Sequence, residues 1–192
     1  MKRAEPQHKA RILNILTESF DTNLSVNYVV KQDTNWKQRI AALMEYSFEV
    51  CMMFGDVWIS DDEKACALAI YPERRKTTLK TMWLDAKLIL TSIGIRGIFK
   101  ALKRESKIKR KQLNLSNYYL WFIGVDRNYQ RKRIGTKLLA EVKDYATAIG
   151  RPILLETSTL SNLPWYEKNG FQVYEQLDLS YRLFFLKTVN AN

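Results

Sequence analysis

The residues best suited to chemistry lie in a short connection between a predicted strand at 118–125 and a predicted helix at 134–150. This connection contains RKRIGTK, in which three consecutive cations precede the first turn of the helix. Such a turn carries unpaired backbone N–H groups and the positive end of the helix dipole, and both favour phosphate. A solvated basic helix start that binds nothing is the alternative. The predicted phosphate loop consists of Gln130, Arg131, Lys132, Arg133, Ile134, Gly135 and Thr136.

Three further candidates follow in LLETSTLSNLPWYEKNGF, residues 154–171. Asn162 and Tyr166 are four residues apart, so a helix would place both on one face. A phenol has a pKa near 10 and a thiol one of roughly 8.5, so protons pass easily between them when they are aligned. Tyr166 is otherwise an aromatic core residue. Glu156 ends the predicted strand, where it would accept a proton or, alternatively, bond to the loop at 157–161.

These two stretches resemble the coenzyme-A signature of the GNAT superfamily of N-acetyltransferases, in which Gln/Arg-x-x-Gly-x-Gly/Ala follows an apolar strand. Gln130 and Gly135 match the outer positions, whereas Arg133 stands where the first glycine falls. The backbone N–H of Arg133 would then have to serve the phosphate. The resemblance implies that acetyl-CoA is the cosubstrate, that Asn162 contacts the coenzyme, and that Tyr166 protonates the departing thiolate.

The resemblance also implies direct transfer of acetyl to an amine in a ternary complex, without an acyl-enzyme. A backbone N–H on the strand at 118–125 would bind the thioester carbonyl, and the candidates are Ile123, Gly124 and Val125. Gly124 fits because a glycine in a strand often marks a bulge or a close backbone approach. Cys51 and Cys66 lie in apolar segments without a nearby histidine, so neither is expected to carry the acyl group.

Within the superfamily, the stretches 57–73, 124–135 and 154–171 are similar to puromycin N-acetyltransferases and their relatives. The N-terminal helices and residues 77–116 match poorly, and these parts are expected to touch the acceptor. The resemblance therefore supports the fold and the acetyl donor more than the substrate. We predict transfer to a primary amine of a small molecule, with a protein or peptide acceptor as the alternative. A non-catalytic module that binds acyl-CoA or nucleic acid is a third reading.

The surrounding pattern predicts one domain of mixed α/β (α+β) class with the GNAT acyl-CoA N-acyltransferase fold, a mostly antiparallel sheet with helices on both faces. Helical spacing of apolar residues predicts helices over 8–20 and 35–54. The basic run to Lys111 and residues 114–117 are expected to be flexible. The other predicted parts are a β-hairpin at 55–75, a helical insertion near the acceptor cleft at 77–116, an acetyl-CoA-binding core at 118–171 and a terminal hairpin at 171–188.

The composition fits a packed domain, because 46% of the 192 residues are hydrophobic. No apolar run reaches the roughly 18–20 residues that a membrane span needs, and the N-terminus lacks the pattern of a signal peptide. We therefore expect a cytoplasmic protein without a membrane partner. The single histidine, His8, is expected at the surface, and no metal site is predicted.

The net charge of +11 leaves three kinds of partner open: a polyanionic small ligand, nucleic acid and an acidic membrane surface. The phosphate loop holds one part of this charge, and the run at 96–111 holds another. The cations of this run fall on several helical faces, so a solvated surface is favoured over a site for the coenzyme 3′-phosphate, RNA or an acidic protein. Few aromatic residues lie among them, which argues against nucleic acid. A homodimer that pairs through the strand at 179–187 is left open.

Overall fold

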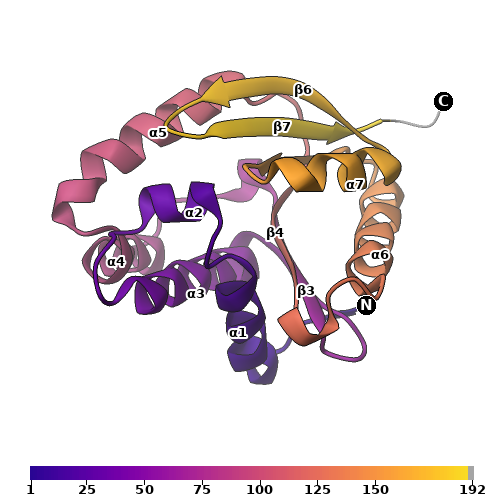
Figure 1. Cartoon of the computed structure of the whole chain (residues 1–192), viewed down its shortest axis with the longest axis horizontal. Coiled ribbons are helices and arrows are strands. Elements are labelled where there is room, and N and C mark those ends of the chain that lie inside the picture. Colours follow the sequence, from indigo (N-terminus) through magenta and orange to yellow (C-terminus); the bar gives the residue numbers. More distant parts are fainter. Residues whose placement is uncertain (190–192) are drawn as a thin grey trace.

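The protein, seen as a computed structural model that describes residues 1–189, is built around one sheet with helices packed on it (Figure 1). The strands lie in the order β1-β2-β3-β4-β5-β7-β6. They are β1 (Lys2–Arg3), β2 (Gly55–Ile59), β3 (Ala65–Ile70), β4 (Tyr118–Val125), β5 (Ile153–Thr157), β6 (Phe171–Asp178) and β7 (Arg182–Thr188). The α-helices are α1 (Lys9–Ser19), α2 (Leu24–Val29), α3 (Trp36–Phe54), α4 (Leu79–Leu88), α5 (Ile98–Lys111), α6 (Ile134–Ala148) and α7 (Leu163–Lys168).

The sheet is split between β4 and β5, which run parallel while the other described pairs are antiparallel. β4 and β5 pair only where Tyr118 faces Ile153 and Tyr119 faces Leu154. Beyond these positions β4 stays paired with β3 as far as Val125, and β5 stays paired with β7. One edge of β4 is therefore free of a neighbouring strand. The predicted mixed, mostly antiparallel sheet with helices on both faces is confirmed.

A β-bulge interrupts the pairing of β4 with β3 at Trp121. Leu68 faces Phe122 and Ala69 faces Leu120, which leaves one extra residue on β4. Gly124 does not mark this bulge. A Cβ on Gly124 would lie 3.1 Å from Leu16 Cδ2 and 3.2 Å from Ser19 Oγ, so the glycine lets α1 approach the strand.

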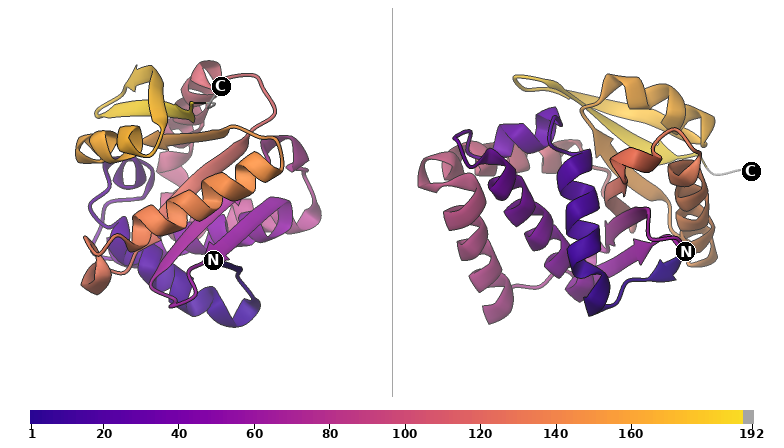
Figure 2. Two further views of the ribbon diagram at one scale, coloured as in Figure 1. Left: turned by 90° about the vertical axis from the view of Figure 1, so that its right-hand side faces the viewer. Right: turned by 60° about the horizontal axis from the view of Figure 1, so that its bottom comes forward.

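Helices cover both faces of the sheet (Figure 2). On one face, α1 and α3 form a buried cluster with side chains of β2, β3 and β4. On the other face, α6 and α7 form a second cluster, which includes Leu120, Phe184 and Leu186. α5 packs on the β6–β7 hairpin through Leu183 and Phe185, which alternate with the β7 residues facing α6. α5 therefore lies on the face opposite α6.

Two parts of the helical region differ from the sequence-based prediction. α2 was not predicted, since its six residues are too few to show a helical period. α5 continues to Lys111, so the expected flexibility of this basic run is wrong there. Ile108 is buried against the β6–β7 hairpin, and Lys111 Nζ lies 3.0 Å from Glu175 Oε2. Cations at the end of a helix also suit the negative end of its dipole.

The terminal hairpin is confirmed, but its second strand lies inside the sheet. β7 pairs with β5 through residues 184–187 and with β6 along nearly its whole length. Both edges of β7 are therefore occupied, and pairing of this strand across a homodimer, as the sequence suggested, is wrong. The described sheet ends at β1 and β6 instead.

Three residues singled out by chemistry alone lie in the interior. Cys51 and Cys66 are fully buried, and burial raises the pKa of both thiols. His8 was expected at the surface, yet it is buried at the start of α1. Its Nδ1 accepts a hydrogen bond from the backbone N–H of Glu5 at 2.9 Å, and its Nε2 lies 3.5 Å from Glu63 Oε1. The imidazole therefore closes the turn before α1.

Candidate active site

The predicted phosphate loop contains two non-glycine residues in the left-handed region of backbone conformation. Arg131 has φ of 60°, and Arg133, the N-cap of α6, has φ of 62°. A left-handed conformation costs a non-glycine residue roughly 1–2 kcal/mol. Arg133 therefore adopts the conformation that a glycine would take more easily. Strain of this kind is often found in ligand-binding loops.

The start of α6 offers a row of unpaired backbone donors. Within the described chain, the N–H groups of residues 131–136 donate no hydrogen bond, and Lys137 N is the first to bond back, to Arg133 O at 3.0 Å. The side chains of Arg131, Lys132 and Arg133 are exposed beside these groups. Unpaired N–H groups at a positive helix end, surrounded by cations, fit the diphosphate of coenzyme A.

Gly135 lets the first turn of α6 lie close to β4 and α7. A Cβ on this residue would be 3.0 Å from Val125 Cγ2 and 4.0 Å from Trp165 Cζ2. The next residue, Thr136, accepts a hydrogen bond from Trp165 Nε1 at 3.0 Å. The hydroxyl proton of Thr136 stays free to be donated. The glycine thus serves packing within the protein.

Tyr166 on α7 is buried beside this loop. Its ring lies edge-on to Phe171, with centroids 5.6 Å apart, and Ile123, Val125 and Ile134 pack on the same cluster. Among the described residues no hydrogen bond engages its hydroxyl, and burial raises its pKa. The phenol therefore remains protonated and free to donate.

Asn162 precedes α7 as its N-cap, is exposed, and makes no capping bond.

The free edge of β4 carries two of the three predicted carbonyl-binding N–H groups. Asp126 N donates to Lys64 O at 2.8 Å, which marks these two residues as a hydrogen-bonded pair of the β3–β4 ladder. Such pairs alternate along an antiparallel ladder, so Gly124 faces β3 while Ile123 and Val125 direct their N–H groups to the free edge. Gly124 is therefore a packing residue, and the other two remain candidates.

Glu156 lies on β5, past the point where β4 has left that strand. Its neighbour Leu155 faces the α6 cluster, so alternation places Glu156 on the opposite face of the sheet from Tyr166. Gln112 Nε2 donates to Glu156 Oε1 at 2.9 Å, so the alternative bond to the loop at 157–161 is not formed. Burial raises the pKa of this carboxyl, although the Gln112 bond and the charge of Arg104 oppose the shift.

Comparison with known proteins agrees with this geometry. Residues 96–173 match the family model described as the acetyltransferase (GNAT) domain. A Corynebacterium glutamicum structure, described as histone acetyltransferase HPA2 and related acetyltransferase, aligns with a TM-score of 0.71 and 15% identity over 100% of this chain and 96% of that one. The fold is that of the GNAT acetyltransferases.

Other acetyltransferase structures align over similar spans. An N-acetyltransferase from Staphylococcus aureus gives a TM-score of 0.57 at 15% identity, over 97% of this chain and 98% of its own. Mosquito arylalkylamine N-acetyltransferase like 5b gives 0.53 at 15% identity, over 97% of each chain. At these identities the likeness establishes the fold. Together with the domain match, it supports an acyl-CoA-dependent acetyltransferase.

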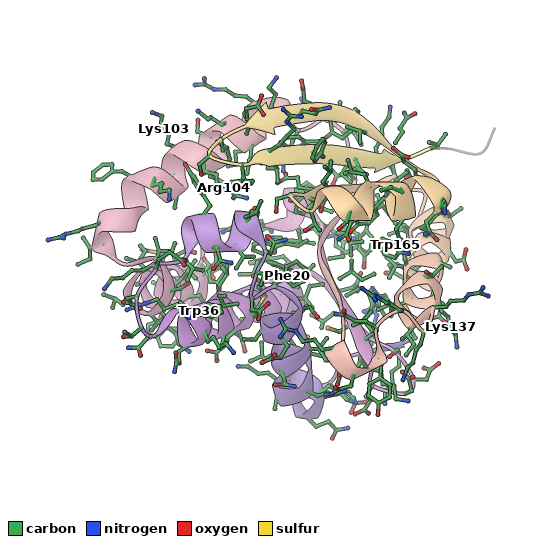
Figure 3. All side chains as sticks on the ribbon, viewed as in Figure 1. Phe20, Trp36, Lys103, Arg104, Lys137 and Trp165 are labelled. Atoms are coloured by element: carbon green, nitrogen blue, oxygen red, sulfur yellow. The ribbon has the colours of Figure 1, made fainter. Side chains whose placement is uncertain are left out.

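Arg104 is a residue of this GNAT fold that sequence reasoning did not single out. Figure 3 shows it pointing inward from α5, whereas the neighbouring Lys103 points outward. Arg104 Nε donates to Tyr181 OH at 2.9 Å, and Nη2 donates to Ser25 Oγ at 2.5 Å. It therefore ties α5 to α2 and to the β6–β7 turn on the Glu156 side of the sheet. In the sequence it is one cation among many in a basic run, so no signal marks it.

Within residues 1–189, no group of three His, Cys, Asp or Glu side chains is arranged to hold a metal ion. None of the helices in that range has the length and apolarity to cross a bilayer.

Proposed function

We propose that the protein transfers the acetyl group of acetyl-CoA to a primary amine of a small molecule, directly and within a ternary complex. The parting of β4 from β5 beside the start of α6 carries this proposal. It creates a free strand edge next to the unpaired N–H groups of residues 131–136. A ligand with a diphosphate and an extended arm suits such a surface, because the diphosphate can bind the helix start while the arm follows the strand edge.

Each candidate residue has a distinct part in this proposal. Bound acetyl-CoA would supply an activated acetyl thioester. Residues 130–136 and Asn162 hold the coenzyme, and an N–H of Ile123 or Val125 polarises the thioester carbonyl. Glu156 accepts the proton of the attacking amine on one face of the sheet, and Tyr166 donates a proton to the thiolate on the other. The raised pKa of Glu156 brings this carboxyl closer to neutral pH, which suits a base, and the raised pKa of Tyr166 keeps the phenol protonated before transfer.

The acceptor class rests on the sequence. The stretches similar to puromycin N-acetyltransferases lie in β2–β3, the phosphate loop and α7. Aminonucleosides are therefore among the first acceptors to test, and the description of the mosquito neighbour as an arylalkylamine N-acetyltransferase is the reason to include arylalkylamines. A protein or peptide acceptor is the competing proposal, and the description of the Corynebacterium neighbour as a histone acetyltransferase is the reason to include peptides.

The decisive experiment measures thiol release from acetyl-CoA with a panel of amines. The panel contains aminonucleosides, arylalkylamines, polyamines and lysine-bearing peptides, and mass spectrometry identifies each product. Acetylation of small amines at the highest kcat/KM supports the proposal. Acetylation of peptides alone moves the function to the competing class. Coenzyme-A binding by calorimetry without turnover of any amine leaves a binding module.

A further inference from the structure

An exposed surface rich in apolar side chains runs from α4 to the first half of α5. Of the thirteen large hydrophobic residues that are exposed among the described residues, seven fall between 79 and 102. Each is more than half exposed, and Leu79 and Phe99 reach 86% and 83%. We call these residues with the cations around them the apolar–basic surface: Leu79, Met82, Trp83, Leu90, Ile95, Phe99 and Leu102. The other six exposed positions are scattered along the chain, which is normal.

Six of the seven side chains form two outward-facing stripes. Leu79, Met82 and Trp83 recur at helical spacing on α4, whose opposite side buries Leu84. Ile95, Phe99 and Leu102 repeat the pattern at the start of α5, whose opposite side carries the inward-pointing Arg104. α4 and the first turns of α5 lie at the same edge of the molecule (Figures 1 and 2). Lys87 Nζ lies 5.5 Å from the centroid of the Trp83 ring, but the side chains of both stripes stay more than half exposed.

The same segment holds most of the net positive charge of the protein, because its excess of nine cations compares with +11 for the whole chain. Residues 76–111 contain eleven lysines and arginines but only two carboxylates, Asp85 and Glu105. Lys80, Lys87 and Lys111 form ion pairs within the chain. Seven cations form no ion pair with any described residue: Lys76, Arg96, Lys100, Lys103, Lys107, Lys109 and Arg110. The charge therefore faces solvent beside the apolar side chains.

We propose that the apolar–basic surface docks on an anionic lipid bilayer. The apolar side chains would enter the boundary between headgroups and acyl chains, and the lysines and arginines would face the lipid phosphates. An exposed tryptophan such as Trp83 is well suited to this boundary. Binding is peripheral, and it departs from the expectation of a protein without a membrane partner.

The alternatives fit the surface less well. A symmetric contact between two copies would bring two strongly positive segments together, and their repulsion opposes it. A nucleic acid would neutralise the cations but leave the exposed Leu, Ile and Phe side chains in contact with phosphate and water. The bilayer satisfies both features at once, because its acyl region takes the apolar side chains and its headgroups take the charge.

The test is co-sedimentation of the whole protein with vesicles of phosphatidylcholine alone and with phosphatidylglycerol added. We expect binding to the anionic vesicles, weak binding to the neutral ones, and loss of binding at high salt. Trp83→Ser and Phe99→Ser should each weaken the partition coefficient about tenfold. Lys103→Gln combined with Lys107→Gln should weaken binding to the anionic vesicles only.

Matched controls lie at the opposite edge of the molecule. Ile149→Ser removes an exposed apolar side chain at the end of α6, and Lys137→Gln removes an exposed cation that Figure 3 shows pointing away from the molecule. Both should bind vesicles like the unchanged protein, and circular dichroism confirms that every variant is folded. Equal binding by all variants, or no binding to anionic vesicles, overturns the proposal. It is also overturned if sedimentation shows a dimer that Phe99→Ser dissociates.

Discussion

Trp165 Nε1 donates a hydrogen bond to Thr136 Oγ1 across 3.0 Å, and this bond joins α7 to the first turn of α6. The two residues are twenty-nine positions apart in the chain. The residue after Trp165 is the proposed acid, Tyr166, and Thr136 lies in the phosphate loop. This bond therefore links the helix that carries Tyr166 to the first turn of α6.

Breaking this bond should lower the stability of the protein and weaken coenzyme-A binding. Trp165→Phe removes the donor and should lower the free energy of unfolding by about 1 kcal/mol, the usual contribution of one such hydrogen bond. It should also weaken coenzyme-A binding several-fold. Denaturant unfolding and calorimetry measure the two effects. In a cycle with Thr136→Val, the effects on stability should be less than additive, while Thr136→Ser, which keeps the acceptor oxygen, should behave like the unchanged protein.

Replacing the proposed acid should slow the reaction without weakening coenzyme binding. Tyr166→Phe removes one hydroxyl for which no partner is found in the described chain, so the buried cluster should remain packed. We expect kcat to fall by about 10²-fold or more, with the Kd of coenzyme A within a factor of two. Because burial raises the pKa of Tyr166, its ionisation should not reduce the rate up to about pH 10. An unchanged kcat would remove Tyr166 from the acid role.

Ionisation of the proposed base, Glu156, should determine how kcat/KM falls at low pH. As a base, Glu156 acts only when ionised, and burial raises its pKa. The kcat/KM should therefore fall as the pH drops through a value above the usual range for a carboxyl group. Glu156→Gln should lower kcat/KM by about 10²-fold at neutral pH and remove this limb. If kcat/KM of the Glu156→Gln variant still falls at low pH, a group other than Glu156 causes that fall.

Glu156→Gln should lower activity but raise the stability of the fold at neutral pH. A carboxyl whose pKa is higher in the folded state stabilises the fold below its unfolded pKa and loses this contribution as the pH rises through the folded value. Ionised Glu156 is thus unfavourable at neutral pH. Glu156→Gln can keep the bond from Gln112, so its melting temperature should exceed that of the unchanged protein at pH 7, and the difference should shrink toward pH 4. A lower melting temperature at pH 7 would contradict the burial argument.

The phosphate loop should tolerate a methyl group at position 135 better than a larger, charged side chain. Gly135→Ala places a Cβ 3.0 Å from Val125 Cγ2, which needs a shift of a few tenths of an ångström. Gly135→Glu adds a negative charge beside the unpaired N–H groups as well. We expect calorimetry to show weakened coenzyme-A binding for the alanine variant and none for the glutamate variant. Tight binding by a folded Gly135→Glu protein would move the coenzyme site elsewhere.

Much of the fold follows from local patterns. The helices at 35–54 and 134–150 were predicted because apolar residues recur at helical spacing and glycine follows. β4 was predicted from its continuous apolar run, and the hairpin of β2 and β3 from two strand-like segments around a turn. In each case neighbouring residues alone determine the element, so the printed sequence carries enough information.

The remaining features depend on residues far apart in the chain. The bulge at Trp121 and the packing role of Gly124 arise from how β4 meets β3 and α1. His8 is buried because of the turn at Glu5 and the approach of Glu63. Arg104 and Gln112 reach Ser25, Tyr181 and Glu156 only after α5 has packed on the sheet. No local pattern reports such contacts.

The place of β7 has a consequence during protein synthesis. A ribosome delivers the chain from its N-terminal end at about 5–20 residues per second, so β5 and β6 emerge before the strand that separates them. Until residues 182–188 leave the exit tunnel, β5 has no partner along most of its length. The nascent chain therefore presents an open strand edge, which is a natural target for chaperones. Translation that stops before Arg182 would leave β5 and β6 without the strand that lies between them.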